Sequence, residues 1–73
     1  MEIGEKLKKI RLEQGVGQRQ LAAAAGTTAA TISRYENGER LPSLMLFIRI
    51  VNALGCQIGE FLDDEDTGGK EAV

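Results

Sequence analysis

The chain has 73 residues, of which 42% are hydrophobic and 27% are charged, and its formal net charge is −2. This length gives one small domain, and the composition is that of an ordinary globular fold. No apolar run approaches the ~20 residues of a membrane-spanning helix, and residues 1–5 lack the basic-then-apolar layout of a signal peptide, so we expect a cytoplasmic protein with no membrane partner.

The chain has few of the side chains that form active sites and metal sites. It has no histidine and a single cysteine, Cys56. A histidine-based triad is therefore excluded, and the chain offers neither a Cys/His metal-ligand cluster nor a phosphate-cradling glycine loop. We expect no enzyme, no metal and no cofactor. Cys56 is interpreted as a buried or half-buried apolar residue, with a redox-sensing thiol as the alternative.

The charges are unevenly distributed along the chain. Residues 1–40 hold seven Lys and Arg against five Asp and Glu, whereas residues 41–73 hold two against six. A nucleic-acid partner is thus compatible with the negative net charge, but we expect only modest non-specific affinity.

Five helices and no strands are predicted, in an all-α fold. The first helix carries Ile3, Leu7 and Ile10 at helical spacing and ends before Gly15 and Gly17. Val16 lies between these glycines and is expected to pack into the core from the loop. Ser43 can cap the fourth helix, and Gly55 ends it. The five expected ranges are 3–14, 18–25, 29–36, 43–54 and 58–62.

The second and third helices are joined by a tight turn. Gly26 can adopt the left-handed backbone conformation found just past a helix end, and Thr28 can cap the next helix. Inward-facing side chains are expected at Leu21, Ala22, Ala25, Ile32 and Tyr35. This is the pattern of a helix-turn-helix, whose second helix can enter the major groove of DNA.

The fourth helix is more apolar than one core-facing stripe requires. Its expected core side consists of Leu44, Phe47, Ile48, Val51 and Leu54. The remaining apolar residues suggest an interface, so we predict a homodimer formed through Met45, Leu46, Ile50 and Cys56, with a monomer as the alternative.

The last helix is expected to close the core through Ile58, Phe61 and Leu62, although Gly59 weakens it. Residues 1–62 are therefore predicted to form the domain. Residues 63–73 are acidic and have almost nothing to bury, so we predict a disordered tail there.

Several short motifs resemble the Cro/CI-type, or XRE-like, helix-turn-helix domain over about residues 3–62. They are Leu21-Ala22, Gly26, Thr31-Ile32-Ser33, Tyr35-Glu36-Asn37-Gly38, Leu41-Pro42-Ser43-Leu44 and Ala53-Leu54-Gly55. The resemblance implies a compact five-helix, lambda-repressor-like fold. It also implies sequence-specific binding of double-stranded DNA and transcription regulation, as a homodimeric repressor on a palindromic operator.

The resemblance leaves another function open, that of a protein-interaction module of the same fold with weak DNA binding. An antitoxin that binds a partner toxin would be one example. Four features favour this alternative: Ala29 and Ala30, which offer only methyl groups, the acidic balance of the chain, and Glu39. Relatives often have a lysine at position 39, where a carboxylate repels the DNA backbone. The apolar fourth helix would then be the binding surface.

The start of the third helix is expected to contact base edges. The base-contacting candidates are Thr28, Ala29, Ala30, Thr31 and Arg34, and a phosphate contact is the alternative role for Arg34. The phosphate-contacting candidates are Gln18, Arg19, Thr27, Ser33, Asn37 and Arg40. The resemblance further implies an internal ion pair between Arg11 and Glu36.

Overall fold

The computed structural model describes residues 3–62, which form five helices and no strand. These are α1 (Ile3–Glu13), α2 (Gln18–Ala25), α3 (Ala29–Glu36), α4 (Leu44–Leu54) and α5 (Ile58–Leu62). The predicted all-α fold is confirmed, and the expected ranges differ from these by one residue at most. The predicted acidic tail at 63–73 lies outside the described residues.

The ends of α4 follow from single residues. The Ser43 hydroxyl accepts a hydrogen bond from the Leu46 N–H at 3.2 Å, and thereby satisfies one of the free amides of the first turn. Gly55 ends the helix with φ of 68°, which a residue with a side chain rarely adopts. The Gln14 side chain then donates to the Leu54 carbonyl at 2.7 Å and ties the end of α1 to the end of α4.

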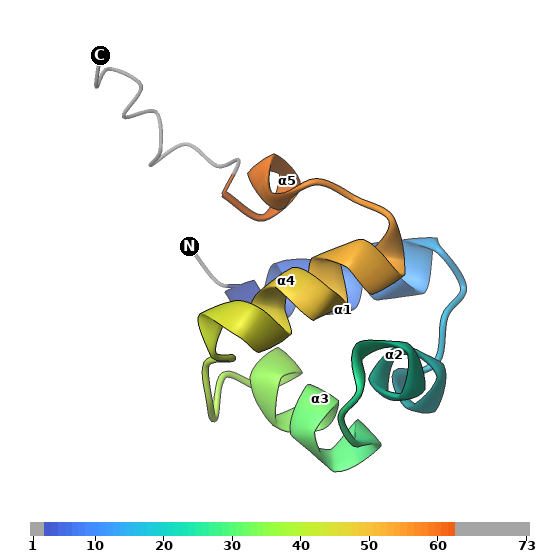
Figure 1. The fold of residues 1–73 in the computed structure, drawn as a ribbon, viewed down its shortest axis with the longest axis vertical. Helices are drawn as coiled ribbons and strands as arrows, with labels where there is room; N and C mark the ends of the chain where they lie inside the picture. Colours follow the sequence, from blue (N-terminus) through green and yellow to red (C-terminus); the bar gives the residue numbers. More distant parts are fainter. Residues whose placement is uncertain (1–2, 63–73) are drawn as a thin grey trace.

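The helices pack in a single layered cluster. In Figure 1, α2 and α3 form the lower part of the molecule, α1 and α4 cross its middle, and α5 lies above them. α2 packs against both α3 and α4, whereas α1 packs against α3 and α5. The second and third helices are thus held from behind while their outer sides remain open to solvent.

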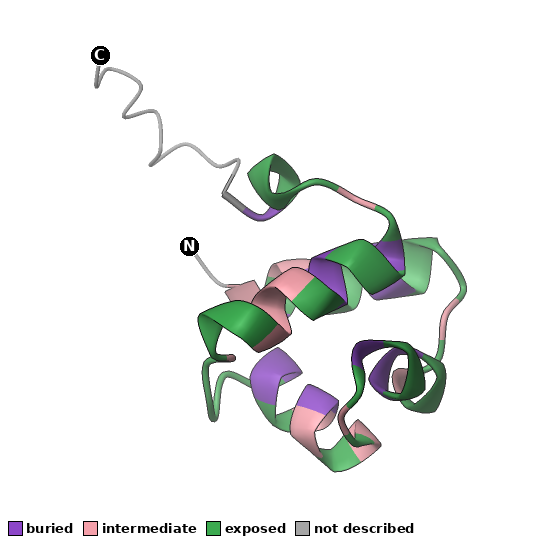
Figure 2. Ribbon diagram, viewed as in Figure 1, coloured by how far each residue is buried: buried purple, intermediate pink, exposed green. Residues whose placement is uncertain are grey.

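The core draws on all five helices. Figure 2 shows the buried segments facing the interior of the cluster. The buried apolar residues are Leu7, Ile10, Leu21, Ala22, Ala25, Ile32, Tyr35, Ile50, Val51, Leu54 and Phe61. Val16 packs against this core from its loop, as predicted. Half-burial of Ile3 confirms the apolar stripe predicted for α1.

A close approach between α1 and α3 depends on Gly4. A Cβ added to this buried glycine would lie 2.0 Å from the Tyr35 carbonyl oxygen and 3.1 Å from that of Glu36. Because these are backbone atoms, they cannot move aside as a flexible side chain would. Only glycine fits at this crossing, a requirement that was not predicted from the sequence.

Two residues of α4 lie on a different side of the helix from the one predicted. Leu44 was expected in the core but is 71% exposed, whereas Ile50 was expected at an interface and is 1% exposed. The core-facing side of α4 is centred between Ile50, Val51 and Leu54, so it is rotated toward Ile50. Leu44, in the first turn, points past the edge of the core.

Phe61 attaches α5 to the rest of the domain. Phe61 is fully buried, and its ring meets that of Phe47 edge-to-face at a centroid distance of 5.1 Å. The prediction that Ile58 closes the core is wrong, since this residue is 41% exposed. Phe61 does close the core as predicted, and the side chain of Leu62 lies outside the described part of the structure.

Candidate nucleic-acid interface

α2 and α3 form the predicted helix-turn-helix, with Gly26 at the turn. Gly26 has φ of 77° and ends α2. Its N–H donates to the Ala23 carbonyl at 3.3 Å, and the Thr27 N–H donates to the Ala22 carbonyl at 2.9 Å. The last carbonyls of α2 are thereby paired within the turn, and the chain leaves in the direction that α3 requires.

The start of α3 is fixed by two threonines. Thr28 Oγ1 accepts a hydrogen bond from the Thr31 N–H at 3.2 Å, as expected of a helix cap. The same oxygen lies 2.9 Å from Thr31 Oγ1, so the two hydroxyls are also bonded to each other. This pairing gives the tip of α3 one defined arrangement.

The outer side of α3 is accessible to solvent. Ile32, Tyr35 and Glu36 face the interior, whereas Ala30 and Arg34 are exposed. The other three predicted base-contacting residues lie beside them: Thr28 is exposed, and Ala29 and Thr31 are half-buried. All five are thus accessible, and they form the ridge of α3, defined here as residues 28–31 and Arg34.

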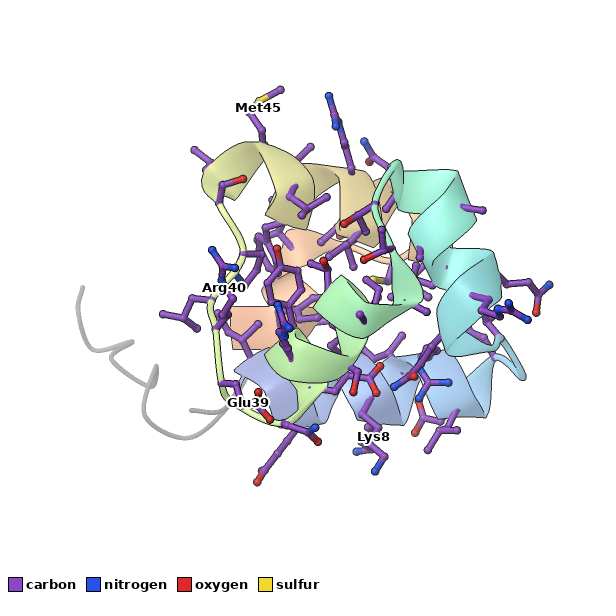
Figure 3. The ribbon with its side chains drawn as sticks, turned by 90° about the horizontal axis from the view of Figure 1, so that it is seen from below. Lys8, Glu39, Arg40 and Met45 are labelled. Carbon is purple, nitrogen blue, oxygen red and sulfur yellow. The ribbon has the colours of Figure 1, made fainter. Side chains whose placement is uncertain are left out.

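The predicted phosphate-contacting residues are all at least partly accessible. Arg19, Asn37 and Arg40 are exposed, and Gln18, Thr27 and Ser33 are half-buried. Figure 3 looks onto α3 from below and shows Arg40 and Glu39 on the loop to one side of it. Lys8 and Met45 mark opposite edges of the same view. Glu39 and Arg40 thus follow each other on this loop, and both side chains are exposed.

A buried ion pair lies behind the ridge. Arg11 Nε donates to Glu36 Oε2 at 2.6 Å, and Arg11 Nη2 donates to Glu36 Oε1 at 3.0 Å. Arg11 Nη1 also donates to the Val16 carbonyl at 2.8 Å. The hydrogen bonding that Arg11 donates to Glu36 raises the pKa of Arg11, burial of the guanidinium opposes this, and the negative charge of Glu36 adds to the rise. This two-pronged pair joins α1 to the end of α3, and every polar atom in it has a partner.

Gln18, at the start of α2, belongs to the same network. Its Nε2 donates to Glu36 Oε1 at 3.0 Å. An amide nitrogen has a second hydrogen, which stays available to a phosphate beside the beginning of α2. Gln18 is a predicted phosphate contact, but its hydrogen bond to Glu36 was not predicted. Since the two residues are 18 positions apart on different helices, no local pattern links them.

The predicted dimer interface is only partly at the surface. Met45 is 63% exposed, Leu46 and Cys56 are half-buried against the core, and Ile50 is buried and cannot line an interface. Leu41 and Leu44 have exposed fractions of 77% and 71%. The apolar surface therefore begins in the loop before α4. We call Leu41, Leu44 and Met45 the apolar patch.

Cys56 follows α4 and packs against the core. Its thiol points to the Val51 carbonyl at 3.9 Å. Burial raises the pKa of this thiol, and the negative charge of Glu60 raises it further. Both effects keep the thiol protonated and poorly reactive, in agreement with a packing role.

Two further features are absent from residues 3–62, the part of the chain that the structure describes. This part of the chain contains no group of three or more His, Cys, Asp or Glu residues that could hold a metal ion. None of its helices is long and apolar enough to cross a membrane.

Comparisons with known proteins agree with this geometry. A family model described as Helix-turn-helix matches residues 7–61. An uncharacterized HTH-type transcriptional regulator from Methanothermobacter thermautotrophicus is 42% identical over 62 residues, a match that covers 82% of this chain and 90% of the relative.

Two further proteins show how far the likeness extends. The HTH-type transcriptional regulator PuuR from Escherichia coli is 29% identical over 70 residues, which is 96% of this chain and 38% of PuuR. The chain thus spans well under half the length of PuuR. The crystal structure of the restriction-modification controller protein C.AhdI from Aeromonas hydrophila matches with a TM-score of 0.79 and 27% identity, covering 82% of this chain and 91% of C.AhdI.

Proposed function

This chain belongs to the helix-turn-helix family of transcriptional regulators, and from that premise we propose that it binds a specific double-stranded DNA sequence and represses transcription. In this proposal it acts in the cytoplasm and occupies a promoter as a homodimer. The ridge of α3 enters the major groove, while the residues around it contact phosphates.

One observation carries the proposal. The ridge of α3 is accessible along its length, whereas the opposite side of the helix is anchored by Ile32, Tyr35 and the buried Glu36. A helix packed in this way can be inserted into a groove without unfolding any part of the domain. The buried ion pair supports its far end, and the capped turn supports its start.

The apolar patch supports the proposed homodimer. Leu41, Leu44 and Met45 are all more than half exposed, which is unusual for three apolar side chains within five residues of so small a domain. A two-fold axis at this patch would present two copies of α3 to one face of DNA. The matching operator would be a palindrome with half-sites about one helical turn apart.

Selection from a random pool of DNA duplexes tests DNA binding. We expect one sequence to be enriched, and its affinity to fall linearly with the logarithm of salt concentration as counterions are released. Enrichment of no sequence, with binding independent of salt, would refute the proposal.

A protein-interaction module with weak DNA binding is the second candidate. The exposed Glu39 beside Arg40 favours it, because this carboxylate would face the DNA backbone. The apolar patch would then contact a different protein, such as the toxin of a toxin–antitoxin pair. Replacing Glu39 with lysine separates the candidates: a DNA-binding protein should bind duplexes more tightly at low salt, whereas an interaction module should retain its partner unchanged.

A further inference from the structure

We infer that the ridge of α3 recognises its DNA mainly through the C5-methyl groups of thymine, and that Arg34 supplies its only strong polar base contact. This inference rests on the proposed function and specifies the chemistry of the same site. It predicts a half-site in which thymines face the start of α3.

The hydroxyl groups at the tip of α3 are largely used within the protein. Thr28 Oγ1 accepts the Thr31 N–H and shares a hydrogen bond with Thr31 Oγ1. Two hydroxyls carry two protons, and one of these lies between the two oxygens. A single O–H therefore remains to donate to a base, and any further donation would require the cap to open.

The rest of the tip is hydrocarbon. Ala29 and Ala30 have only methyl groups, and Ala30 is exposed. Each threonine adds a methyl group next to its bonded hydroxyl. Among the residues of α3, only Arg34, one turn further on, is both exposed and long enough for paired hydrogen bonds to a base.

The thymine methyl is the group in the major groove that such a surface can distinguish. It is the apolar feature of the base edges there, whereas guanine, adenine and cytosine present donors and acceptors. A polar edge placed against Ala30 would lose its hydration without gaining a partner. A short, methyl-covered tip also lets α3 sit deep enough for these groups to touch.

Replacement of thymine by deoxyuridine tests the inference, because it removes the methyl group and keeps every hydrogen-bonding atom. In the operator selected from the random pool, each thymine of a half-site is replaced in turn. We expect at least one replacement to weaken binding about fourfold, the amount that corresponds to one buried methyl group.

Protein variants show whether the ridge is what senses the methyl. Ala30→Gly removes the exposed methyl, and Thr31→Ser removes a methyl while keeping the hydroxyl bonded to Thr28. At least one of them should bind the thymine and deoxyuridine operators equally. Ala24→Gly is the matched control, because it makes the same change at an exposed position of α2 and should retain the fourfold difference. Circular dichroism verifies that each variant is folded.

The outcomes separate the inference from the proposed function. If an operator is selected but binds equally well with deoxyuridine at every position, methyl recognition is wrong and specific DNA binding stands. If the fourfold difference persists in both methyl-deleted variants, the methyl groups of Ala30 and Thr31 do not sense the thymine, and the inference is also wrong. If no operator is selected, both the inference and the proposed function fail.

Discussion

Arg34 and Arg11 illustrate two opposite uses of the same side chain. Arg34 is exposed on the ridge of α3, whereas Arg11 is buried and both its donor edges are occupied by Glu36 and Val16. Both residues are arginines, so their chemistry alone does not distinguish these two roles. The distinction comes from the helix face on which each lies, and it decides whether a substitution affects binding or folding.

Arg34→Ala should weaken binding to the selected operator by about 1–3 kcal/mol, the usual contribution of a paired contact to guanine. Random DNA should lose much less affinity, since it offers no guanine at the matching place. Titration of both duplexes at one salt concentration gives the comparison. Equal losses on the two would assign Arg34 to a phosphate instead.

Arg11→Met should destabilise the domain by about 3–5 kcal/mol, because Glu36 would be left buried without its partner. Urea unfolding followed by circular dichroism measures the loss. The double variant Arg11→Met with Glu36→Leu should be more stable than Arg11→Met alone, because it leaves no buried charge without a partner. If the double variant were the less stable of the two, burial of an unpaired charge would not be the cause.

At the scale of the helices, local signals and tertiary contacts play separate parts. The range of α4 was predictable because Ser43 and Gly55 act on their own neighbours in sequence. The rotation of α4 was not, since it depends on which side α1, α2 and α5 leave open. The role of Gly4 could not be predicted for the same reason, because it depends on the Tyr35 carbonyl that lies beside it in the fold.

Gly4→Ala should lower stability, although alanine is the better helix former by up to about 1 kcal/mol. The added methyl would meet backbone atoms of α3, and overpacking of this kind costs about 1–3 kcal/mol. Gly59→Ala is the matched control, because nothing lies within 4 Å of the added Cβ in α5. We expect it to raise the melting temperature while Gly4→Ala lowers it. A rise in both would show that α1 and α3 can separate freely.

At the scale of the whole molecule, the ridge of α3 and the apolar patch are distinct surfaces. The residues of the patch precede and begin α4, and Figure 3 places Met45 at the edge of the molecule, away from α3. A second copy can thus cover the patch while the ridge remains open. The sequence predicted an apolar interface that includes Ile50 of α4, whereas the structure buries Ile50 and exposes Leu41 and Leu44.

Met45→Glu should shift the protein toward monomer in sedimentation velocity, because it places a charge within the apolar patch. Its affinity for the full operator should fall, and that for an isolated half-site should not. Asn52→Glu adds the same charge at an exposed position of α4 outside the patch and serves as the control. An unchanged mass for Met45→Glu would place the dimer contact elsewhere.

One carboxylate, that of Glu36, connects three helices, since it accepts from Arg11 in α1 and from Gln18 in α2 while belonging to α3. Such an arrangement restricts how related proteins can diverge. A change at position 36 would leave two donors behind, so we expect positions 11, 18 and 36 to be inherited as a set. A descendant that altered one of them would need to replace the others before it regained a rigid framework.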